Sequence, residues 1–445
     1  TDVSTESRNK GFSYGKRGNK EGGYKMGKTI TEKILAKASG KAEVSPGEYV
    51  HVSTRCPIVL GFGLEKGPNQ VKALGAKVFN PGLLRIVDGH RGVTASHGVT
   101  EGRPAIREWA RQMGVPQENI YELGRQGIEH VFSGERCWAL PGEVFFEVVN
   151  GHASSLGALG AFAATFSYES GAYLVTGRTW IRVPETVKFN IRGQLPHGVL
   201  ARDVFEYVLR QVGGAGAPYQ VMEWTGPVID AMDMAGRFTL CCNALFTGAW
   251  TGIINPDGKT IDYVKARTSE TFEPLVSDPI AEFAKVYDFD VSQIEPQVVP
   301  PPKRDTAKPI SEVLGVKINR GFIGSCENSR IDDMRVAARV LKGKKIRPDV
   351  QLNITPGTVN IYLQCLREGL LETFIEAEAT VPPPACGMCL GANTPLGRGD
   401  VCISTGTCNY PGRMGSRDAE IYLGSPATVA ASCIEGRITD PRNYL

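Results

Sequence analysis

The hydrophobic and polar positions of the chain follow a helical period in some segments and form short β-branched runs in others. Residues 28–40 (KTITEKILAKASG) place apolar side chains three and four positions apart and end at Gly40, which predicts a helix. Short β-branched runs and a further helical pattern follow in alternation, at 48–53, 76–79, 84–87 and 105–113. Strands that alternate with helices predict α/β layers.

Further along the chain, residues 174–191 (LVTGRTWIRVPETVKFNI) predict a β-hairpin and residues 197–212 predict a helix. The segment 297–308 (QVVPPPKRDTAK) combines three consecutive prolines with charged residues, which is typical of a linker. We therefore expect an N-terminal α/β unit over 27–296 and a C-terminal α/β domain over 309–445.

The composition excludes several classes of protein. Hydrophobic residues make up 42% of the 445 residues, but no long apolar run is present, so neither a membrane-spanning helix nor a membrane partner is expected. The first residues lack the apolar core of a secretory signal, which favours a cytoplasmic protein.

The net charge is +3, and residues 1–26 alone supply +3, with six basic against three acidic side chains. A balanced body argues against nucleic acid as a partner. The composition of 1–26 predicts a flexible basic tail, with contact to an acidic surface as the alternative.

The informative cysteines lie beside small and polar residues. The chain has 11 cysteines, of which Cys365 and Cys433 lie in apolar patterns and are expected in the core. Cys386 and Cys389 form a C-x-x-C with an intervening glycine, which lets two thiolates converge on one turn, and the distant Cys326 in GSCENSR can complete a three-thiolate cluster site. Three protein ligands would leave one iron open as a Lewis acid.

The C-x-x-C alone leaves other kinds of site open. A redox pair, a disulfide or a structural zinc site are the alternatives, and Cys402 and Cys408 lie near enough in sequence to supply further zinc ligands.

The order of longer motifs resembles one family. The segments that carry the resemblance are QGIEHVF, LPGEVFFEVVNGHASSLGALGAF, GRFTLCCNALFTGAWTG, GSCENSRIDDMRVAARVLKG, CGMCLGA, GDVCISTGTCNYPGRMGS and YLGSPATVAASCIEGRITDP. Over about residues 27–445 the chain resembles the aconitase / 3-isopropylmalate dehydratase large-subunit family. The resemblance implies three α/β domains around a [4Fe–4S] cluster, two of them within 27–296 with a boundary near 190–215. The mobile fourth domain of the long aconitases has no counterpart in this sequence. In two-subunit relatives it is a separate small subunit that carries substrate-binding Ser and Arg residues.

The resemblance also assigns roles to single residues. The cluster ligands it implies are Cys326, Cys386 and Cys389. The catalytic residues it implies are His130, His152, Asp88 and His90, with Gly89 splitting the Asp-His pair of the relatives. The substrate-binding residues it implies are Arg413, Asn150, Asn328, Ser329 and Arg330.

Several positions depart from the family pattern. The aspartate of the family's Asp-Ser-His-Thr motif is Asn150, so His152 is expected to be neutral at pH 7 unless another carboxylate, for which Asp88 is the candidate, takes its place. A family arginine is replaced by Cys408, which removes a guanidinium from the pocket.

Two further departures lie in one segment. A family Asn aligns with Cys242 and a family Glu with Phe246, although a shift of one residue would restore the Asn at position 243.

The resemblance therefore predicts an iron–sulfur hydro-lyase acting on a small hydroxy-carboxylic acid other than citrate or isopropylmalate. The chain would be the large subunit of a hetero-oligomer, with a small subunit that supplies the missing domain. Two alternatives remain: a cluster-dependent sulfur-transfer enzyme, for which Cys242 and Cys408 would be suited, and a non-catalytic cluster-bearing partner whose acid/base groups have decayed.

Overall fold

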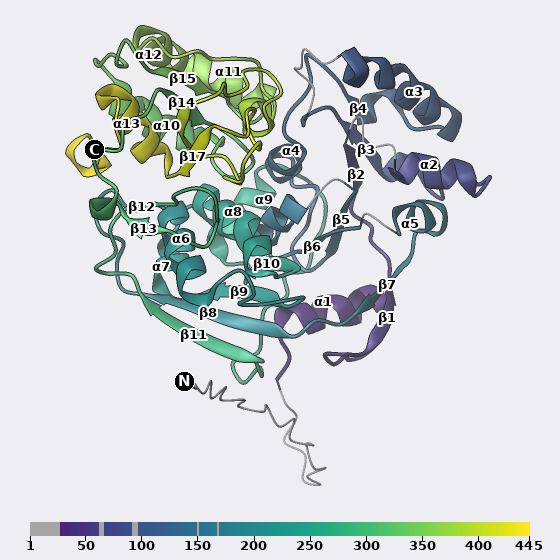
Figure 1. The fold of residues 1–445 in the computed structure, drawn as a ribbon. Helices are drawn as coiled ribbons and strands as arrows, with labels where there is room; N and C mark the ends of the chain where they lie inside the picture. Colours follow the sequence, from purple (N-terminus) through teal and green to yellow (C-terminus); the bar gives the residue numbers. More distant parts are fainter. Residues whose placement is uncertain (1–26, 62–65, 91–96, 149–150, 167–168) are drawn as a thin grey trace, which may run out of the picture.

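Three parallel β-sheets form the framework of the molecule (Figure 1). The computed structural model describes residues 27–61, 66–90, 97–148, 151–166 and 169–445. None of the described helices is long and apolar enough to cross a membrane.

The first unit, purple to blue in Figure 1, carries a five-stranded sheet of order β4-β3-β2-β5-β6. Its strands are β2 (Ile58–Gly61), β3 (Leu84–Val87), β4 (Ile120–Tyr121), β5 (Val144–Val148) and β6 (Phe162–Thr165). Its helices are α1 (Ile30–Ser39), α2 (Lys66–Ala73), α3 (His97–Met113), α4 (Glu129–Glu135) and α5 (Ser170–Thr176), with the 3-10 helix η3 (Gly151–Leu159) after β5. A separate antiparallel pair joins β1 (Tyr49–Val52) to β7 (Thr179–Arg182).

The second unit has a four-stranded sheet of order β10-β9-β8-β11, and the third has one of order β15-β14-β16-β17. The second contains β8 (Thr186–Arg192), β9 (Val221–Thr225), β10 (Thr251–Ile254), β11 (Lys285–Asp290), α6 (Ala201–Val212), α7 (Pro227–Ala231), α8 (Met234–Asn243) and α9 (Gly258–Lys265). The third contains β14 (Arg320–Ile323), β15 (Gln351–Ile354), β16 (Val401–Ser404), β17 (Glu420–Leu423), α10 (Ile331–Leu341), α11 (Val359–Arg367), α12 (Leu370–Glu376) and α13 (Pro426–Glu435).

The first helix shows how the local sequence sets its bounds. The Thr29 side chain accepts from the backbone of Glu32, and the Glu32 carboxylate accepts in return from the backbone of Thr29. This capping box satisfies two backbone donors at the start of α1. Gly40 ends the helix in the left-handed conformation, at a φ of 69°, which a glycine adopts without steric cost.

Residues 174–191 do not form the expected hairpin. β7 pairs with β1 at the rim of the first unit, whereas β8 is a central strand of the second sheet between β9 and β11. The connection Val183–Glu185 contains Pro184 and lacks the Asn-Gly type of turn that closes a tight hairpin. Residues 76–79, expected as a strand, form a loop.

Residues 297–308 lie between the second and third units, where the sequence analysis expects a linker, and the two ends of the segment pair with each other. The segment forms an antiparallel pair between β12 (Gln297–Val298) and β13 (Lys308–Pro309). Val298 and Val299 are fully buried. The three prolines lie in the loop between these two short strands, and Pro302 is exposed. The domain boundaries drawn from the sequence stay a prediction.

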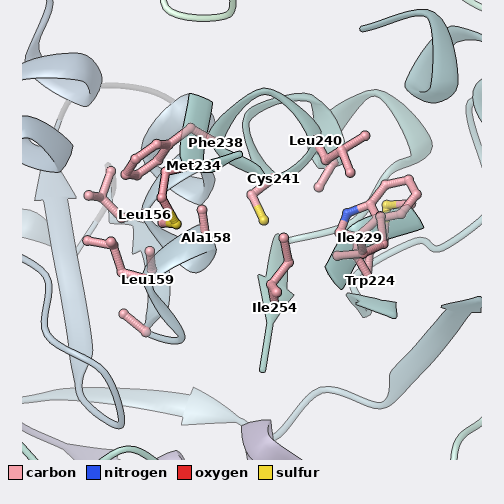
Figure 2. Close-up of a cluster of buried hydrophobic side chains, with 14 of the residues drawn as sticks. Leu156, Ala158, Leu159, Trp224, Ile229, Met234, Phe238, Leu240, Cys241 and Ile254 are labelled. Atoms are coloured by element: carbon pink, nitrogen blue, oxygen red, sulfur yellow. The ribbon is translucent and has the colours of Figure 1, made fainter. Parts of the chain in front are cut away.

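The largest core cluster lies beneath α8, where helix and sheet pack in the second unit. Figure 2 shows Cys241 and Leu240 of α8 above Ile254 and Trp224, with Leu156 and Ala158 of η3 beside them. Because one face of α8 is held in this core, the core determines the direction in which the next residue, Cys242, faces the rest of the molecule.

Candidate active site

The three predicted cluster thiols lie in loops that leave buried β-strands of the third unit or pack against them. Cys326 follows β14 after Ser325, whose φ of 71° turns the chain sharply. Cys386 caps the start of the 3-10 helix η6 (Gly387–Leu390) and Cys389 lies within it, and the backbone N–H of Cys389 donates to Cys386 O at 3.1 Å. All three are at most 3% exposed. The backbone N–H of Cys386 also donates to Gly89 O at 3.0 Å, which ties this turn to the first unit.

The chemistry of these donors fits an iron–sulfur cluster. A hydrogen bond with Cys242, together with burial, raises the pKa of the Cys326 thiol well above its ordinary value. Burial raises the pKa of Cys386 likewise, and the thiols of Cys389 and Cys326 beside it raise it further. Three thiolates can share so buried a site only when cations neutralise them, and iron does so.

Three histidine rings lie in a row beside the thiols. The ring centroids of His90 and His130 are 5.4 Å apart, and those of His130 and His152 are 6.0 Å apart. His90 follows β3, His130 lies on α4, and His152 begins η3 after β5. The structure thus brings together all three histidines that the sequence assigned to the site.

Each of the first two histidines has a buried carboxylate partner that the sequence analysis missed. His90 Nδ1 pairs with Glu129, and His130 Nδ1 lies 2.8 Å from Glu147 Oε2. Both carboxylates have no exposed surface. The signals were present: Glu129 stands beside His130, and Glu147 interrupts the apolar strand VFFEV of β5.

The pKa values of the two carboxylates are shifted in opposite directions. Burial alone would raise the pKa of Glu129, but His90 and His130 beside it hold that pKa below its ordinary value. Burial and the charge of Glu129 raise the pKa of Glu147 well above the ordinary value. When the pKa values of two neighbouring carboxyl groups differ in this way, one group can act as a charged partner and the other can carry a proton.

Asp88 does not take the place of the missing aspartate, which corrects that expectation. Its carboxylate pairs with Arg103, whose Nη2 lies 3.1 Å from Asp88 Oδ2. Burial raises the pKa of Asp88 to about 6. Gly89 has a packing reason to split the Asp-His pair, because a Cβ at this position would lie 2.1 Å from Gly127 O.

His152 has thiols rather than an aspartate beside it. Its Nδ1 lies 3.1 Å from Cys242 O and 3.5 Å from Cys242 Sγ. Burial alone would lower the pKa of His152, but the Cys326 thiol and Glu327 raise it to about 9. This upward shift of the pKa is opposite in direction to the neutral ring that the sequence analysis expects.

Cys242, and not Asn243, faces this site, so the one-residue shift that would restore an Asn is not realised. Asn243 instead donates to Thr239 O at 2.9 Å within α8 and accepts from Arg304 at 2.8 Å. The Phe246 ring lies 5.8 Å from that of His152 and adds an apolar wall.

Arg413 extends along the cluster thiols. Its Nη2 donates to Cys389 Sγ at 3.4 Å and to Thr407 Oγ1 at 3.3 Å. Its Nε is buried and has no hydrogen-bond partner among the described residues. A buried guanidinium N–H without an acceptor can donate a charge-assisted hydrogen bond to a bound anion.

The other predicted substrate-binding residues are less open to a substrate. Asn328 donates to Asp333 Oδ1 at 2.9 Å and accepts from Arg202 at 3.1 Å, so its amide is engaged at both ends. The Arg330 guanidinium donates to the carbonyl oxygens of Cys326 and Glu327. These contacts support the loop around Cys326. Ser329 is fully buried, and Asn150 lies outside the described residues.

A guanidinium stands near Cys408 after all, supplied by the hairpin that was expected to be a linker. Arg304 Nε donates to Thr407 O at 3.0 Å, and its guanidinium carbon lies 4.6 Å from the Phe246 ring centroid. Sequence order gave no sign of this, because Arg304 is about a hundred residues from Cys408.

Arg304 is neutralised within a buried group of four charges. It pairs with Glu206 and lies 3.6 Å from Glu327 Oε2, while Arg202 Nη1 lies 2.9 Å from the same oxygen. Two arginines thus balance two glutamates, which is how buried charges are tolerated. We infer that Arg304 holds the loop of Thr407 in place rather than adding free positive charge.

Comparisons with known proteins agree with the geometry. The chain matches the model of the Aconitase family (aconitate hydratase) over residues 105–315 and 306–436. It is 39% identical over 423 residues to 3-isopropylmalate dehydratase large subunit 1 of Methanopyrus kandleri, covering 94% of this chain and 100% of that protein. It is 40% identical over 426 residues to the 3-isopropylmalate dehydratase large subunit of Halothermothrix orenii, again covering 94% and 100%. The holo form of Thermococcus kodakaraensis aconitase X aligns with 80% of this chain and 84% of its own, at 13% identity and a TM-score of 0.45, too low to support an argument.

Proposed function

The chain belongs to the aconitase family as an iron–sulfur hydro-lyase large subunit, and from that premise we propose that it works with a small subunit on a small hydroxy-carboxylic acid other than citrate or isopropylmalate. The observation that carries the proposal is the buried Nε of Arg413 without a partner, beside a cluster thiol. It marks a place for one carboxylate of a substrate.

Three residues of this chain would hold the [4Fe–4S] cluster: Cys326, Cys386 and Cys389. When bound, the cluster supplies a Lewis-acidic iron that can polarise a substrate oxygen. Every other part of the chemistry falls to the side chains around it.

Arg413 binds and orients the substrate carboxylate through a charge-assisted hydrogen bond from Nε. The His130–Glu147 pair can hold a proton at Nδ1 or at the glutamate oxygen 2.8 Å away, and so can donate or accept one at the ring. Glu129 fixes His90 through the contact between its carboxylate and His90 Nδ1 in the same buried layer. These intact pairs argue against a decayed, non-catalytic site.

The pocket favours a substrate with fewer carboxylates than citrate. Arg304, which donates to the carbonyl of Thr407 beside Cys408, is already neutralised by Glu206 and Glu327. Phe246 beside His152 offers an apolar contact. The unpartnered N–H of Arg413 and the apolar wall of Phe246 suit a substrate with a hydrophobic side or a single well-bound carboxylate.

The small subunit enters the proposal because the relatives are named large subunits and the chain spans their full length. A partner of roughly 150–220 residues, the size of one domain, would cover the site and complete it.

The test is turnover of a panel of hydroxy acids and the corresponding enoates by anaerobically reconstituted protein, with and without its small subunit. We expect water addition or removal only with both subunits, and no meaningful rate on citrate. Full turnover by the isolated chain would contradict the two-subunit proposal, and brisk turnover of citrate by the pair would contradict the specificity. Sulfide release without hydration would instead support the sulfur-transfer alternative.

A further inference from the structure

Two consecutive cysteines of α8 have opposite surroundings. Cys241 points into the hydrophobic cluster with Leu240 and Ile254, as Figure 2 shows, whereas Cys242 is buried against His152 and Cys326. The proposed function gives Cys242 no role, because the cluster is held by other thiols. A second buried thiol against a cluster ligand therefore needs its own explanation.

The ligand atoms of His152, Cys242 and Cys326 all lie within 4.8 Å of one another. The Cys242 Sγ to His152 Nδ1 distance is 3.5 Å. A tetrahedral ion with metal–sulfur bonds near 2.3 Å and metal–nitrogen bonds near 2.0–2.1 Å separates S and N by about 3.5 Å and two sulfurs by about 3.8 Å. The three donors are thus already close to the spacing that one ion requires.

The predicted cluster ligands are spaced differently. In the described part of the chain, the set of His152, Cys242 and Cys326 meets this 4.8 Å limit, whereas Cys326, Cys386 and Cys389 do not form such a set. The latter three are therefore suited to a group larger than a single ion. Cys326 is common to both sets.

Two thiols and an imidazole select the kind of cation. Thiolate sulfur and imidazole nitrogen suit zinc and similar soft or borderline divalent ions, whereas calcium and magnesium take oxygen ligands. Three protein ligands leave one tetrahedral position for water.

We propose that the protein without its cluster binds one zinc-class divalent cation through Cys242, Cys326 and His152. The ion replaces the two thiol protons and the proton on the His152 ring nitrogen that binds it, all three of which are released to solvent, and takes up the lone pair that this nitrogen then offers. No electron is transferred. Because Cys326 serves both sets, the bound ion and the complete cluster exclude each other. The inference rests on the proposed function only for the role of Cys326 as a cluster ligand.

The probe is Co²⁺ added anaerobically to cluster-free full-length protein, because thiolate–cobalt bonds give an absorption band whose intensity counts the thiolates. We expect one Co²⁺ per chain with two thiolate ligands, displaced by Zn²⁺. Bound Zn²⁺ should also slow cluster reconstitution until a chelator removes it. The wild-type protein and each variant are compared by circular dichroism to establish that they fold alike.

Matched variants separate the two metal sets. Cys242→Ala should weaken Co²⁺ binding by roughly 100-fold or more, since losing a direct ligand exceeds the 10–100-fold cost of losing an outer partner. Cys241→Ala, one residue away, should leave binding unchanged. Cys386→Ala should abolish the cluster and leave Co²⁺ binding intact, and Cys326→Ala should abolish both.

Two results would overturn the inference. The first is loss of Co²⁺ binding in Cys386→Ala, which would place the ion on the cluster thiols. The second is unchanged binding in Cys242→Ala. Failure of the proposed function looks different, because wild-type protein would then assemble no cluster and yet bind Co²⁺ through two thiolates.

Discussion

The two sides of the site are built in the same way but carry different chemistry. On the first unit, His90 and His152 follow the parallel strands β3 and β5. On the third unit, Cys326 and Cys408 lie in the loops that follow β14 and β16. In both units the loops leave the carboxyl ends of a parallel sheet, where open α/β sheets place their ligand sites.

The difference lies in how each side obtains its partners. Cys386 and Cys389 converge through one local turn, so four consecutive residues contain the geometry. The histidines depend on carboxylates supplied across the fold. Glu129 stands beside His130 in sequence but pairs with His90, while Glu147 reaches His130 from β5.

The comparison shows that a broken motif need not mean a lost interaction. Asn150 replaces an aspartate of the family motif, yet the first unit holds two buried histidine–carboxylate pairs. Cys408 replaces an arginine, yet Arg304 places a guanidinium against the same loop.

We expect the largest effect from a change to one of the cluster thiols. Cys389→Ser should remove the cluster, because serine oxygen is a poor ligand for iron and the other two thiols cannot hold a cubane alone. Iron and acid-labile sulfide should fall from about four each per chain to near zero. Cys433→Ser, in the core of the same unit, is the control and should retain them. Stoichiometric zinc without sulfide in the wild-type protein would contradict the cluster assignment.

On the histidine side, Glu147→Gln should lower kcat by about 10²–10⁴-fold while the cluster is retained, because His130 loses the partner that carries its proton. Steady-state rates and iron content are measured on the same sample. Glu143→Gln, just before β5 and paired with Lys37 and Arg55, is the matched control. A large loss in both variants would mean that stability, and not the proton, is affected.

We expect a smaller effect on activity from a change to Arg413, the residue proposed to bind the substrate carboxylate. Arg413→Ala should lower kcat/KM by about 10–150-fold, equivalent to the ~1.5–3 kcal/mol of a charge-assisted hydrogen bond. The exposed Arg398→Ala in the same unit is the control, since its side chain is 87% exposed. An unchanged kcat/KM in Arg413→Ala would place the substrate carboxylate elsewhere.

These tests follow the line between what the sequence could and could not predict. The cluster thiols, the three histidines and Arg413 could be predicted because each lies in a contiguous motif. Glu147 and Arg304 could not, since their roles depend on which strands and loops meet in space. The hairpin at 174–191 failed for the same reason, because β7 and β8 find partners far away in sequence.

The pH dependence of stability should be determined by a residue that lies outside the site, on neither the histidine side nor the thiol side. Asp203 on α6 accepts from the backbone N–H groups of Leu200 and Gln297, each at 2.8 Å, and so ties the second unit to the hairpin. Burial raises its pKa from 3.8 to about 7. Between pH 4 and 7 the folded chain therefore binds more protons than the unfolded chain, so stability falls as the pH rises through this window.

Asp203→Asn should flatten that fall, by at most about 1.4 kcal/mol per pH unit for one proton, and lower stability at pH 4, where one acceptor oxygen is lost. Denaturant unfolding of both proteins at several pH values measures the slope. Asp333, whose pKa burial also raises to about 7, remains in both proteins, so part of the slope should persist. An identical slope in wild type and variant would mean that Asp203 is ionised throughout this range. The pH profile of kcat should not change with the variant, because Asp203 contacts neither the histidines nor the thiols among the hydrogen bonds of the described residues.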